Sequence, residues 1–338
     1  MLGDIGIDLG TSKTVIIKNK RIMLCEPSVV LMDNYDEVPV SFGKYAFEAI
    51  GRSTERYSAV CPIERGVISD YDMAEQMLGE YMSRVIGKTV TKPRVVVSIP
   101  SGITSVERRS VIDAVQTSGG RNVCTIEAPV AAALGMGIDF TKPHGTVIVD
   151  IGSGTTDVAV MSMGGLSCCE TAKIAGLDID NAIIKYLKRE YNLNIGVHSA
   201  MQIKHQIGSA MPRNVEIAMV AKGLSASSGM PISVEITGNE IYEAISEVVS
   251  GICSAIQTVI NKTPPELVGD ITDEGIYLTG GTAQLNGLAD VLSEYLGVKI
   301  RVADDVNLCV ARGIGIAMNH FELLENGDYR FTTMQDLI

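Results

Sequence analysis

The chain contains no tryptophan, and only 5% of its 338 residues are aromatic. Its seven cysteines form no C-x-x-C pair and their number is odd, which indicates buried free thiols in a reducing cytoplasm. The four histidines are scattered along the sequence and suggest no metal cluster. We therefore expect neither disulfide bonds nor a metal centre built from histidine and cysteine.

Basic residues are also scarce: 28 lysines and arginines stand against 40 acidic residues, for a formal net charge of −12. A nucleic-acid-binding face would need the opposite balance, so we exclude nucleic acid as a partner. A nucleotide remains compatible with this charge, because backbone amides and a metal ion can hold its phosphates. No apolar run approaches the ~18 residues of a membrane-spanning helix. We also expect no signal peptide and no amphipathic anchor ahead of the first strand.

The two common phosphate-binding strings, G-x-x-x-x-G-K-[ST] and G-x-G-x-x-G, are absent too. What the sequence does have is 46% apolar residues, enough for two domains with full cores. Strands and helices alternate, as in the strand Arg94–Pro100, a helix over 104–117 and the strand Val123–Ile126. In that helix we expect Ser105 as the N-cap and Val106 in the core. This alternation predicts an α/β fold with helices against a central sheet.

One stretch, Val147–Asp157, combines a strand, a carboxylate and a glycine turn in the order V-I-V-D-I-G-S-G-T-T-D. Its β-branched residues predict a buried strand, and Asp150 lies where that strand leaves the core. Gly152 and Gly154 allow the backbone to approach a ligand closely and to point successive N–H groups at a phosphate. Taken alone, an ordinary β-hairpin with a glycine turn explains the stretch as well.

The same device occurs a second time, near the start of the chain. Ile5–Thr14 reads I-G-I-D-L-G-T-S-K-T, so that Asp8–Thr11 matches Asp150–Ser153 about half a chain later. A repeated strand–aspartate–glycine turn predicts two similar halves that face one nucleotide, each with its own phosphate loop.

A third glycine turn, L-T-G-G-T-A (278–283), lies between a buried strand and a helix. A ledge without side chains would let an adenosine lie flat on the backbone, whereas the plainer interpretation is a helix-entry turn. Its coincidence with the two phosphate loops favours the first interpretation.

These residues together resemble the actin-like ATPase superfamily and, within it, the bacterial MreB/Mbl family. The resemblance covers nearly the whole chain and implies an α/β, ribonuclease H-like duplicated fold with two domains, each with a large and a small subdomain, around a nucleotide cleft. It implies domain I at 1–142 plus 312–338, with small subdomain IB at 31–65, and domain II at 143–311, with small subdomain IIB at 179–242. The motifs that carry it are I-G-I-D-L-G-T (5–11), E-P-S-V-V (26–30), G-V-I-S-D-Y (66–71), I-P-S-G-I-T-S-V-E-R-R (99–109), E-A-P-V-A-A-A-L-G (127–135), D-I-G-S-G-T-T-D-V-A-V (150–160), T-P-P-E-L (263–267) and L-T-G-G-T (278–282).

The resemblance also implies ATP and Mg²⁺ as cofactors and a role for each motif. Asp8 and Asp150 would lie near the metal, through water, and Asp157 would help to position the attacking water, with Glu127 as a second candidate catalytic residue. The implied nucleotide contacts are Thr11, Ser12 and Lys13 in the first loop, Ser153, Gly154 and Thr155 in the second, Met201, Gln202, Ile203 and Lys204 beside the base and ribose, and Gly280, Gly281, Thr282 and Ala283 behind the adenine.

Four positions depart from the family pattern. Ala128 replaces a water-orienting glutamate directly before the proline and leaves only Glu127, so hydrolysis should be slow or re-routed. Lys13 replaces an asparagine and adds a charge for the phosphates, Met201 removes an acceptor beside the ribose, and Thr282 replaces a third glycine. Neutral drift explains each one singly, whereas together they favour a diverged paralogue that binds nucleotide and hydrolyses it poorly.

The resemblance implies a head-to-tail homopolymer that acts in cell shape by guiding cell-wall synthesis at the inner face of the cytoplasmic membrane, with paralogues and the cell-wall elongation machinery as further partners. Peripheral membrane contact would involve the loop 87–92, where only Val90 is apolar and two lysines could meet anionic headgroups at about 1 kcal/mol each. A solvated loop is the alternative. A non-polymerising switch of the chaperone or accessory type, and a small-molecule kinase, are the competing functions.

Overall fold

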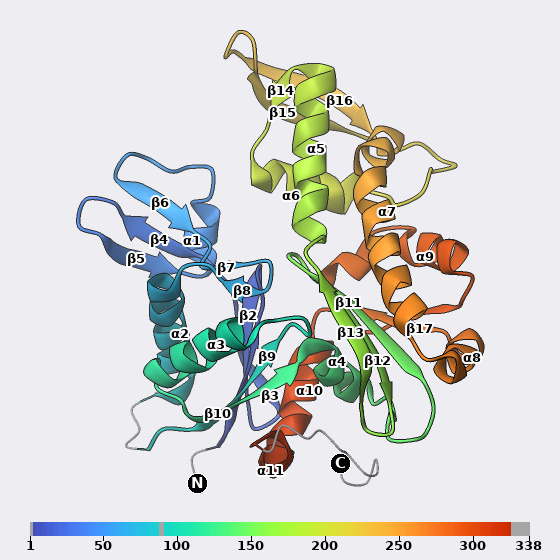
Figure 1. The fold of residues 1–338 in the computed structure, drawn as a ribbon. Helices are drawn as coiled ribbons and strands as arrows, with labels where there is room; N and C mark the ends of the chain where they lie inside the picture. The colour runs from blue at the N-terminus through green and yellow to red at the C-terminus, as the bar shows by residue number, and fades with distance from the viewer. Residues whose placement is uncertain (1–2, 88–90, 326–338) are drawn as a thin grey trace.

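The computed structural model describes residues 3–87 and 91–325, apart from the side chain of residue 323. It contains two five-stranded sheets (Figure 1). In spatial order, the first sheet consists of β10 (Arg121–Glu127), β9 (Arg94–Ile99), β1 (Ile5–Leu9), β2 (Lys13–Lys18) and β3 (Arg21–Pro27). The second sheet consists of β18 (Ile300–Val302), β17 (Ile276–Thr279), β11 (Thr146–Ile151), β12 (Thr156–Ser162) and β13 (Gly165–Ala172).

The two sheets follow one plan. In the first, β1 pairs antiparallel with β2 and parallel with β9. In the second, β11 pairs antiparallel with β12 and parallel with β17. The predicted α/β fold with two similar halves is therefore confirmed.

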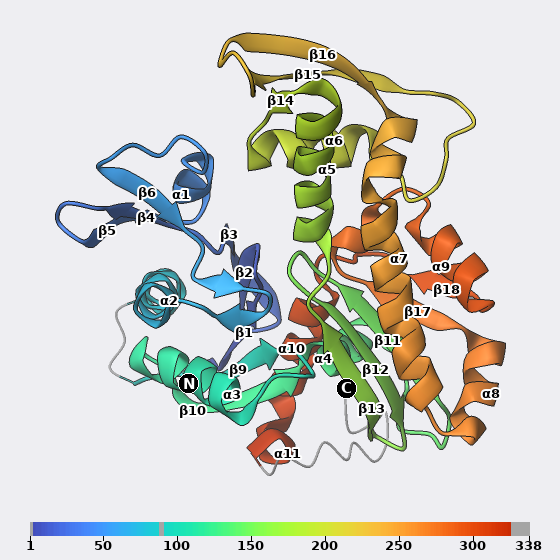
Figure 2. The ribbon, with the colours of Figure 1, turned by 45° about the horizontal axis from the view of Figure 1, so that its top comes forward.

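Alternating strand residues divide the core into layers. Ile5 and Ile7 of β1 belong to the core cluster on one face of the first sheet. Val15 and Ile17 of β2 belong to the cluster on the opposite face. That opposite side packs on two helices that lie between the sheets, which Figure 2 shows from a second angle. The helices of the outer layer on the first sheet are α2 (Tyr71–Ile86) and α3 (Ser105–Thr117), and those between the sheets are α4 (Ala128–Met136) and α10 (Cys309–Ala317).

The helices α4 and α10 cross at very short range because each carries a glycine at the contact. A methyl group on Gly135 would lie 1.9 Å from the carbonyl oxygen of Cys309, and one on Gly313 would lie 1.6 Å from that of Ala131. Side chains at these two positions would force the helices apart. The outer face of the second sheet is covered by α7 (Gly238–Lys262), α8 (Pro265–Glu274) and α9 (Leu288–Leu296).

Each half carries a smaller unit, and both small units lie at the same end of the molecule in Figure 1. The N-terminal one consists of β4 (Val30–Asp33), β5 (Val38–Phe42), α1 (Lys44–Glu48) and β6 (Tyr57–Val60), followed by the hairpin β7 (Ile63–Glu64) and β8 (Val67–Ile68). The C-terminal one consists of α5 (Gly176–Tyr191), β14 (Leu193–Asn194), α6 (Val197–Ile207), β15 (Ala218–Ser225) and β16 (Pro231–Thr237). The exact domain limits given above stay a prediction.

The long helix α7 packs on the core of the second half. By length and composition alone α7 could cross a membrane. However, it is amphipathic: Ile241, Ile245 and Ile252 are buried in the core of the second half, whereas Glu243 and Glu247 are exposed. The remaining elements are the 3₁₀ turns η1 (Gly281–Gln284) and η2 (Met318–His320) and the helix α11 (Phe321–Glu325).

The start of α3 differs from the prediction. Thr104, not Ser105, is the N-cap: its side chain accepts from the Glu107 amide, and the Glu107 carboxylate accepts from the Thr104 amide. Val106 is 73% exposed, so its assignment to the core was wrong. Nine residues at about 100° each put it opposite Val115, which is buried. Of the expected membrane loop, residues 88–90 lie outside the described residues, as do 326–338 of domain I.

Candidate functional site

The two aspartate–glycine loops have the same backbone turn. In the first loop (residues 10–13), the Gly10 amide donates to the carbonyl oxygen of Lys13 at 3.0 Å. In the second loop (residues 152–155), the Gly152 amide donates to that of Thr155 at 2.9 Å. Each loop joins two antiparallel strands at the centre of its sheet. The sequence repeat therefore corresponds to a structural repeat.

The two loops touch each other. A methyl group on Gly154 would lie 2.5 Å from Thr11 Oγ1 and 2.9 Å from the Cα of Arg65. Only a residue without a side chain fits this point of contact. The predicted convergence of the two loops is confirmed.

The aspartates of the two loops lie in different surroundings. Asp8 Oδ1 accepts a hydrogen bond from Ser98 Oγ at 2.8 Å. Burial raises the pKa of Asp8, while this hydrogen bond and the charge of Lys13 oppose the rise. Asp150 lies directly opposite Asp157 in the β11–β12 register. Burial, followed by the negative charges of Asp157 and Asp8, raises the pKa of Asp150 to about 8, against the opposing charge of Lys13.

Lys13 also links the two halves of the chain. Its ammonium group donates to the carbonyl oxygen of Asn307 at 3.0 Å and lies 3.4 Å from the Asn307 side-chain oxygen. Because its charge acts on both Asp8 and Asp150, it is a built-in cation beside the two carboxylates.

The carboxylates fit a hydrated metal ion better than a directly bound one. Among the described residues, no three carboxylate, thiol or imidazole groups converge closely enough to hold a metal ion. Asp8 and Asp150 are nonetheless hard oxygen donors, and Mg²⁺ keeps several of its waters in nucleotide sites. The donor set therefore suits a Mg²⁺ ion that is shared with phosphate oxygens and reached through water.

Asp157 is fixed by three donors. Its Oδ1 accepts from the Ser101 amide at 3.1 Å and from the Thr171 hydroxyl, and its Oδ2 accepts from Thr155 Oγ1 at 2.9 Å. Burial raises its pKa, and the bonds from Thr171 and Thr155 oppose the rise. Oδ2 keeps the capacity for a further donor such as water.

The third glycine turn packs on the second loop. Thr282 Oγ1 donates to the carbonyl oxygen of Gly152 at 2.6 Å. A methyl group on Gly280, whose φ is +89°, would lie 2.4 Å from Asp150 Oδ1. Gly281 begins the 3₁₀ turn η1, and Ala283 is buried in the core. All three glycine turns are thus brought together.

The four residues predicted beside the base and ribose lie on α6 with different exposures. Met201 is half-buried, Gln202 is exposed, and Ile203 is 2% exposed in the core, so that the Ile203 side chain contributes packing. Lys204 donates to the carbonyl oxygen of Gly176 at 3.0 Å and to Asp180 at 2.9 Å. Its ammonium group is therefore engaged at the start of α5.

Glu127 ends β10 and is the N-cap of α4, with Ala128 and Pro129 in the first turn of that helix. Its carboxylate is buried, and Oε1 accepts from Arg108 Nη2 at 3.0 Å. Within the part of the chain that the structure describes, Oε2 has no hydrogen-bond partner. A buried carboxylate oxygen without a donor is free to accept from a water molecule.

Three contributors to the site were not anticipated: Ser98, Asn307 and the pair Arg65–Asp178. The strand R-V-V-V-S-I (94–99) did contain a signal, because a hydroxyl residue among buried β-branched ones needs a polar partner. Asn307 contacts Lys13 from 294 positions away in the sequence, and Arg65 and Asp178 are 113 positions apart. No local sequence pattern predicts either contact.

Comparison with known proteins agrees with this architecture. The family model described as MreB/Mbl protein matches residues 2–326. The cell shape-determining protein Mbl of Bacillus subtilis is 40% identical over 325 residues, which cover 95% of this chain and 97% of that protein. The cell shape-determining protein MreB of Escherichia coli is 38% identical over 327 residues, 95% and 94% of the two chains.

Solved structures show the same fold. MreB5 of Spiroplasma citri bound to ADP has a TM-score of 0.90 at 31% identity and covers 94% of this chain and 97% of its own. A MamK double helical filament has a TM-score of 0.79 at 21% identity, with 94% and 98% coverage, and supports the fold alone. The actin-like plan of two matching halves, the three glycine turns and the match over nearly the whole length lead to one conclusion: the chain belongs to the MreB/Mbl family.

Proposed function

We propose that this protein binds ATP with Mg²⁺ between its two loops and assembles head to tail into filaments that determine cell shape. The contact between Gly154 and Thr11 carries the proposal, because it brings both phosphate loops to one place. The solved structures of MreB5 of Spiroplasma citri, one bound to ADP and one to AMPPNP, support a nucleotide as the ligand.

In this proposal the backbone amides of both loops hold the phosphates. Thr11, Ser12 and Lys13 act from one side and Ser153–Thr155 from the other. Lys13 would exchange its bond with Asn307 for a phosphate oxygen. Asp8 and Asp150 would hold Mg²⁺ through water, and the bound metal would neutralise charge on the phosphate oxygens.

The nucleoside lies against the other two elements. Gly280–Ala283 offers the ledge for the adenine, and the Met201–Lys204 segment of α6 borders the ribose. Gln202 is the exposed polar side chain of this segment, and Lys204 would have to share its ammonium group with Asp180.

Hydrolysis is slow in this proposal. An alanine at position 128 cannot orient a water molecule, and the free Oε2 of Glu127 is the nearest substitute in sequence. Asp157 contributes through its Oδ2. Phosphoryl transfer to water depends mostly on positioning and charge, so a misplaced acceptor slows it without abolishing it.

The proposal also includes filament formation and a cytoplasmic location with contact at the inner face of the cell membrane. Paralogues and the cell-wall elongation machinery are the proposed partners. The support for the proposal is family membership and the exposed apolar side chains of the small N-terminal unit: Tyr35 is 68% exposed, Tyr45 67% and Val40 51%. Heterologous contacts of this kind extend into filaments because they do not close.

The test combines nucleotide binding with sedimentation and electron microscopy of the purified protein. We expect Mg-ATP to bind and filaments to pellet with ATP. Nucleotide binding without filaments under any condition would favour a non-polymerising switch instead.

For hydrolysis, Ala128→Glu should raise the rate of phosphate release and Glu127→Gln should lower it. A wild type that already hydrolyses as fast as Ala128→Glu would contradict the slow-hydrolysis proposal.

A further inference from the structure

The hairpin β7–β8 has an unusual turn. Its two central residues, Arg65 and Gly66, have φ values of +46° and +77°. A two-residue turn with positive φ at both positions is common in hairpins, but asparagine or glycine normally occupies the first position. An arginine in this left-handed conformation is strained, and contacts of its side chain can offset that strain.

Those contacts cross from the first half of the chain to the second. The guanidinium group of Arg65 donates to Asp178 Oδ1 at 2.9 Å and Oδ2 at 3.3 Å, and also to the carbonyl oxygen of Lys173. Asp178 is held in turn by the Ala175 amide at 2.9 Å, at the start of α5. A planar guanidinium fork fits this carboxylate in a way that an ammonium group cannot.

The turn also joins the two phosphate loops. On one side, the Gly66 amide donates to Thr11 Oγ1 in the first loop at 2.9 Å. On the other, Asp178 lies on the helical turn whose Leu177 amide donates to the carbonyl oxygen of Ser153 in the second loop at 2.8 Å. With the direct contact of Gly154 and Thr11, these bonds close a ring that contains both loops and the β7–β8 turn.

We propose that Arg65 is a positioning residue for the nucleotide: through Asp178 it holds the second loop against the first and so slows release of the bound phosphates. This inference rests on the proposed function. The ion pair is partly solvated, with side-chain exposures of 42% for Arg65 and 22% for Asp178. An exposed pair is readily broken and is screened by salt, which suits a contact that must open for exchange.

A second cross-half contact would open together with this one. Farther out, His198 of α6 meets Phe47 of α1, with ring centroids 4.6 Å apart and an edge-to-face angle of 86°. The His198 ring nitrogen Nε2 lies 2.9 Å from the carbonyl oxygen of Phe47. Release of Arg65 should therefore let the two small units separate.

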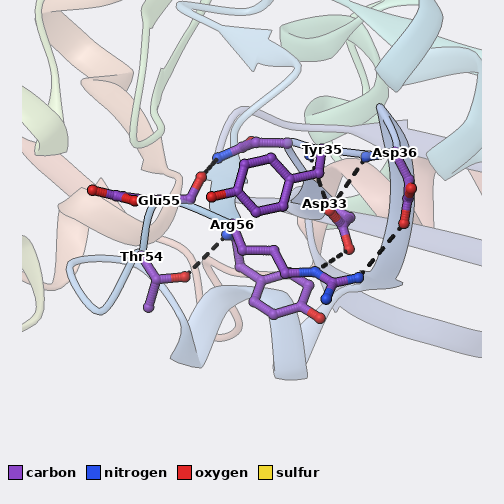
Figure 3. A network of polar contacts seen from close by, with 8 residues as sticks. Asp33, Tyr35, Asp36, Thr54, Glu55 and Arg56 are labelled. Atoms are coloured by element: carbon purple, nitrogen blue, oxygen red, sulfur yellow. Dashed lines mark hydrogen bonds and ion pairs between the residues drawn. The ribbon is translucent and has the colours of Figure 1, made fainter.

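Another arginine provides a matched control. Arg56 pairs with Asp33 at 2.8 Å and with Asp36 at 3.5 Å, but all three lie inside the small N-terminal unit (Figure 3). Its loss removes a similar ion pair without touching either phosphate loop.

The experiment compares Arg65→Asn, Asp178→Asn and Arg56→Asn in the full chain. Asparagine suits the turn, so Arg65→Asn should keep or raise the melting temperature without nucleotide. We expect release of a fluorescent ATP analogue to become about five- to tenfold faster in Arg65→Asn and Asp178→Asn, with the association rate unchanged. The double variant should be no faster than either single variant, and Arg56→Asn should match wild type.

Salt gives a readout that a purely structural role would not move. Release from wild type should accelerate as sodium chloride rises, and this dependence should be weaker in Arg65→Asn, which keeps the phosphate contact of Lys13 but lacks the Arg65–Asp178 pair. Unchanged release rates in Arg65→Asn, or an undiminished salt dependence, would overturn the proposal.

A distance measurement separates this proposal from the proposed function. Spin labels at positions 45 and 230 report the separation of the two small units without nucleotide. The background replaces Cys25, Cys61 and Cys169 by serine, because these three thiols are exposed and not buried as the sequence predicted. Arg65→Asn should lengthen and broaden this distance, whereas Arg56→Asn should not. If wild type binds no nucleotide, the proposed function fails, and the distance alone decides: a longer distance supports the ring of contacts, and an identical one refutes it.

Discussion

The two aspartate–glycine loops are built alike but are not equivalent. In the first half, Asp8 lies opposite the apolar Val15 and receives a hydrogen bond from Ser98. In the second half, Asp150 lies opposite a second carboxylate, Asp157, and among the described residues only the charge of Lys13 opposes the rise in its pKa. The carboxyl group of the first half thus has a hydrogen-bond donor, whereas the second half holds two buried carboxyl groups side by side, one of which keeps its proton up to about pH 8.

This difference implies a division of labour. Two ionised carboxylates that are buried together cost free energy unless a cation compensates them, so on the proposed function the second half would gain most from a bound Mg²⁺. The first half instead supplies a ready scaffold and the extra cation Lys13. The four predictions that follow test this asymmetry.

The largest effect should come from the point where the loops meet. Gly154→Val would push a side chain into Thr11 and Arg65, and we expect ATP affinity to fall by about 100-fold or more, equal to about 2.7 kcal/mol. Gly152→Ala is the matched change in the same loop: its methyl group meets only the Thr155 oxygen, at 3.5 Å. Isothermal titration with Mg-ATP measures both. Equal losses in the two variants would contradict a direct contact of the loops.

The next effect concerns the metal. Asp150→Asn should weaken Mg-ATP binding by roughly tenfold or more, whereas Asp8→Asn, whose partner Ser98 can reorient to the amide, should weaken it less. Both variants should bind ATP in EDTA nearly as wild type does. A larger loss for Asp8→Asn would reverse the proposed division of labour.

A third prediction concerns pH. Between the unfolded pKa of about 3.9 and its folded pKa of about 8, Asp150 keeps a proton that the unfolded chain has released. Stability without nucleotide should therefore fall as pH rises through this range and level off above pH 8. Asp150→Asn should flatten the curve and exceed the wild-type melting temperature by about 2–4 °C or more at pH 8. Thermal melts at pH 5 to 9 measure this. An unchanged slope would show that Asp150 is already ionised.

The smallest effect should come from the third turn. Thr282→Val keeps the shape of the side chain but removes the 2.6 Å bond to Gly152, at a cost of about 1 kcal/mol or about fivefold in ATP affinity. Thr282→Ser keeps the hydroxyl and should bind as wild type does. A similar loss in the serine variant would assign the effect to packing of the methyl group.

Much of this site could be read from the sequence because its signals are local. The repeated Asp-Gly turns each occupy a few consecutive residues, and each follows a short apolar run that marks a buried strand. The asymmetry could not be read, because it depends on register: nothing local shows that Asp150 faces Asp157 while Asp8 faces Val15.

Long-range contacts were invisible for the same reason. Lys204 was expected beside the base and ribose, and no local pattern showed that it pairs with Asp180 on another helix. The sequence around Arg65 did not predict its ion-pair partner. It did not predict the left-handed φ of Arg65 either, because tertiary contacts set that conformation at a non-glycine residue. The misplaced Val106 shows that even a local helical period needs the correct cap to set its phase.

A structure of this protein with AMPPNP and Mg²⁺ tests the account most directly. The account predicts that the β- and γ-phosphates accept hydrogen bonds from backbone amides of both loops, 10–13 and 152–155, with the metal hydration shell on Asp8 and Asp150. A triphosphate that contacts one loop alone, or a nucleotide seated away from both, would contradict it.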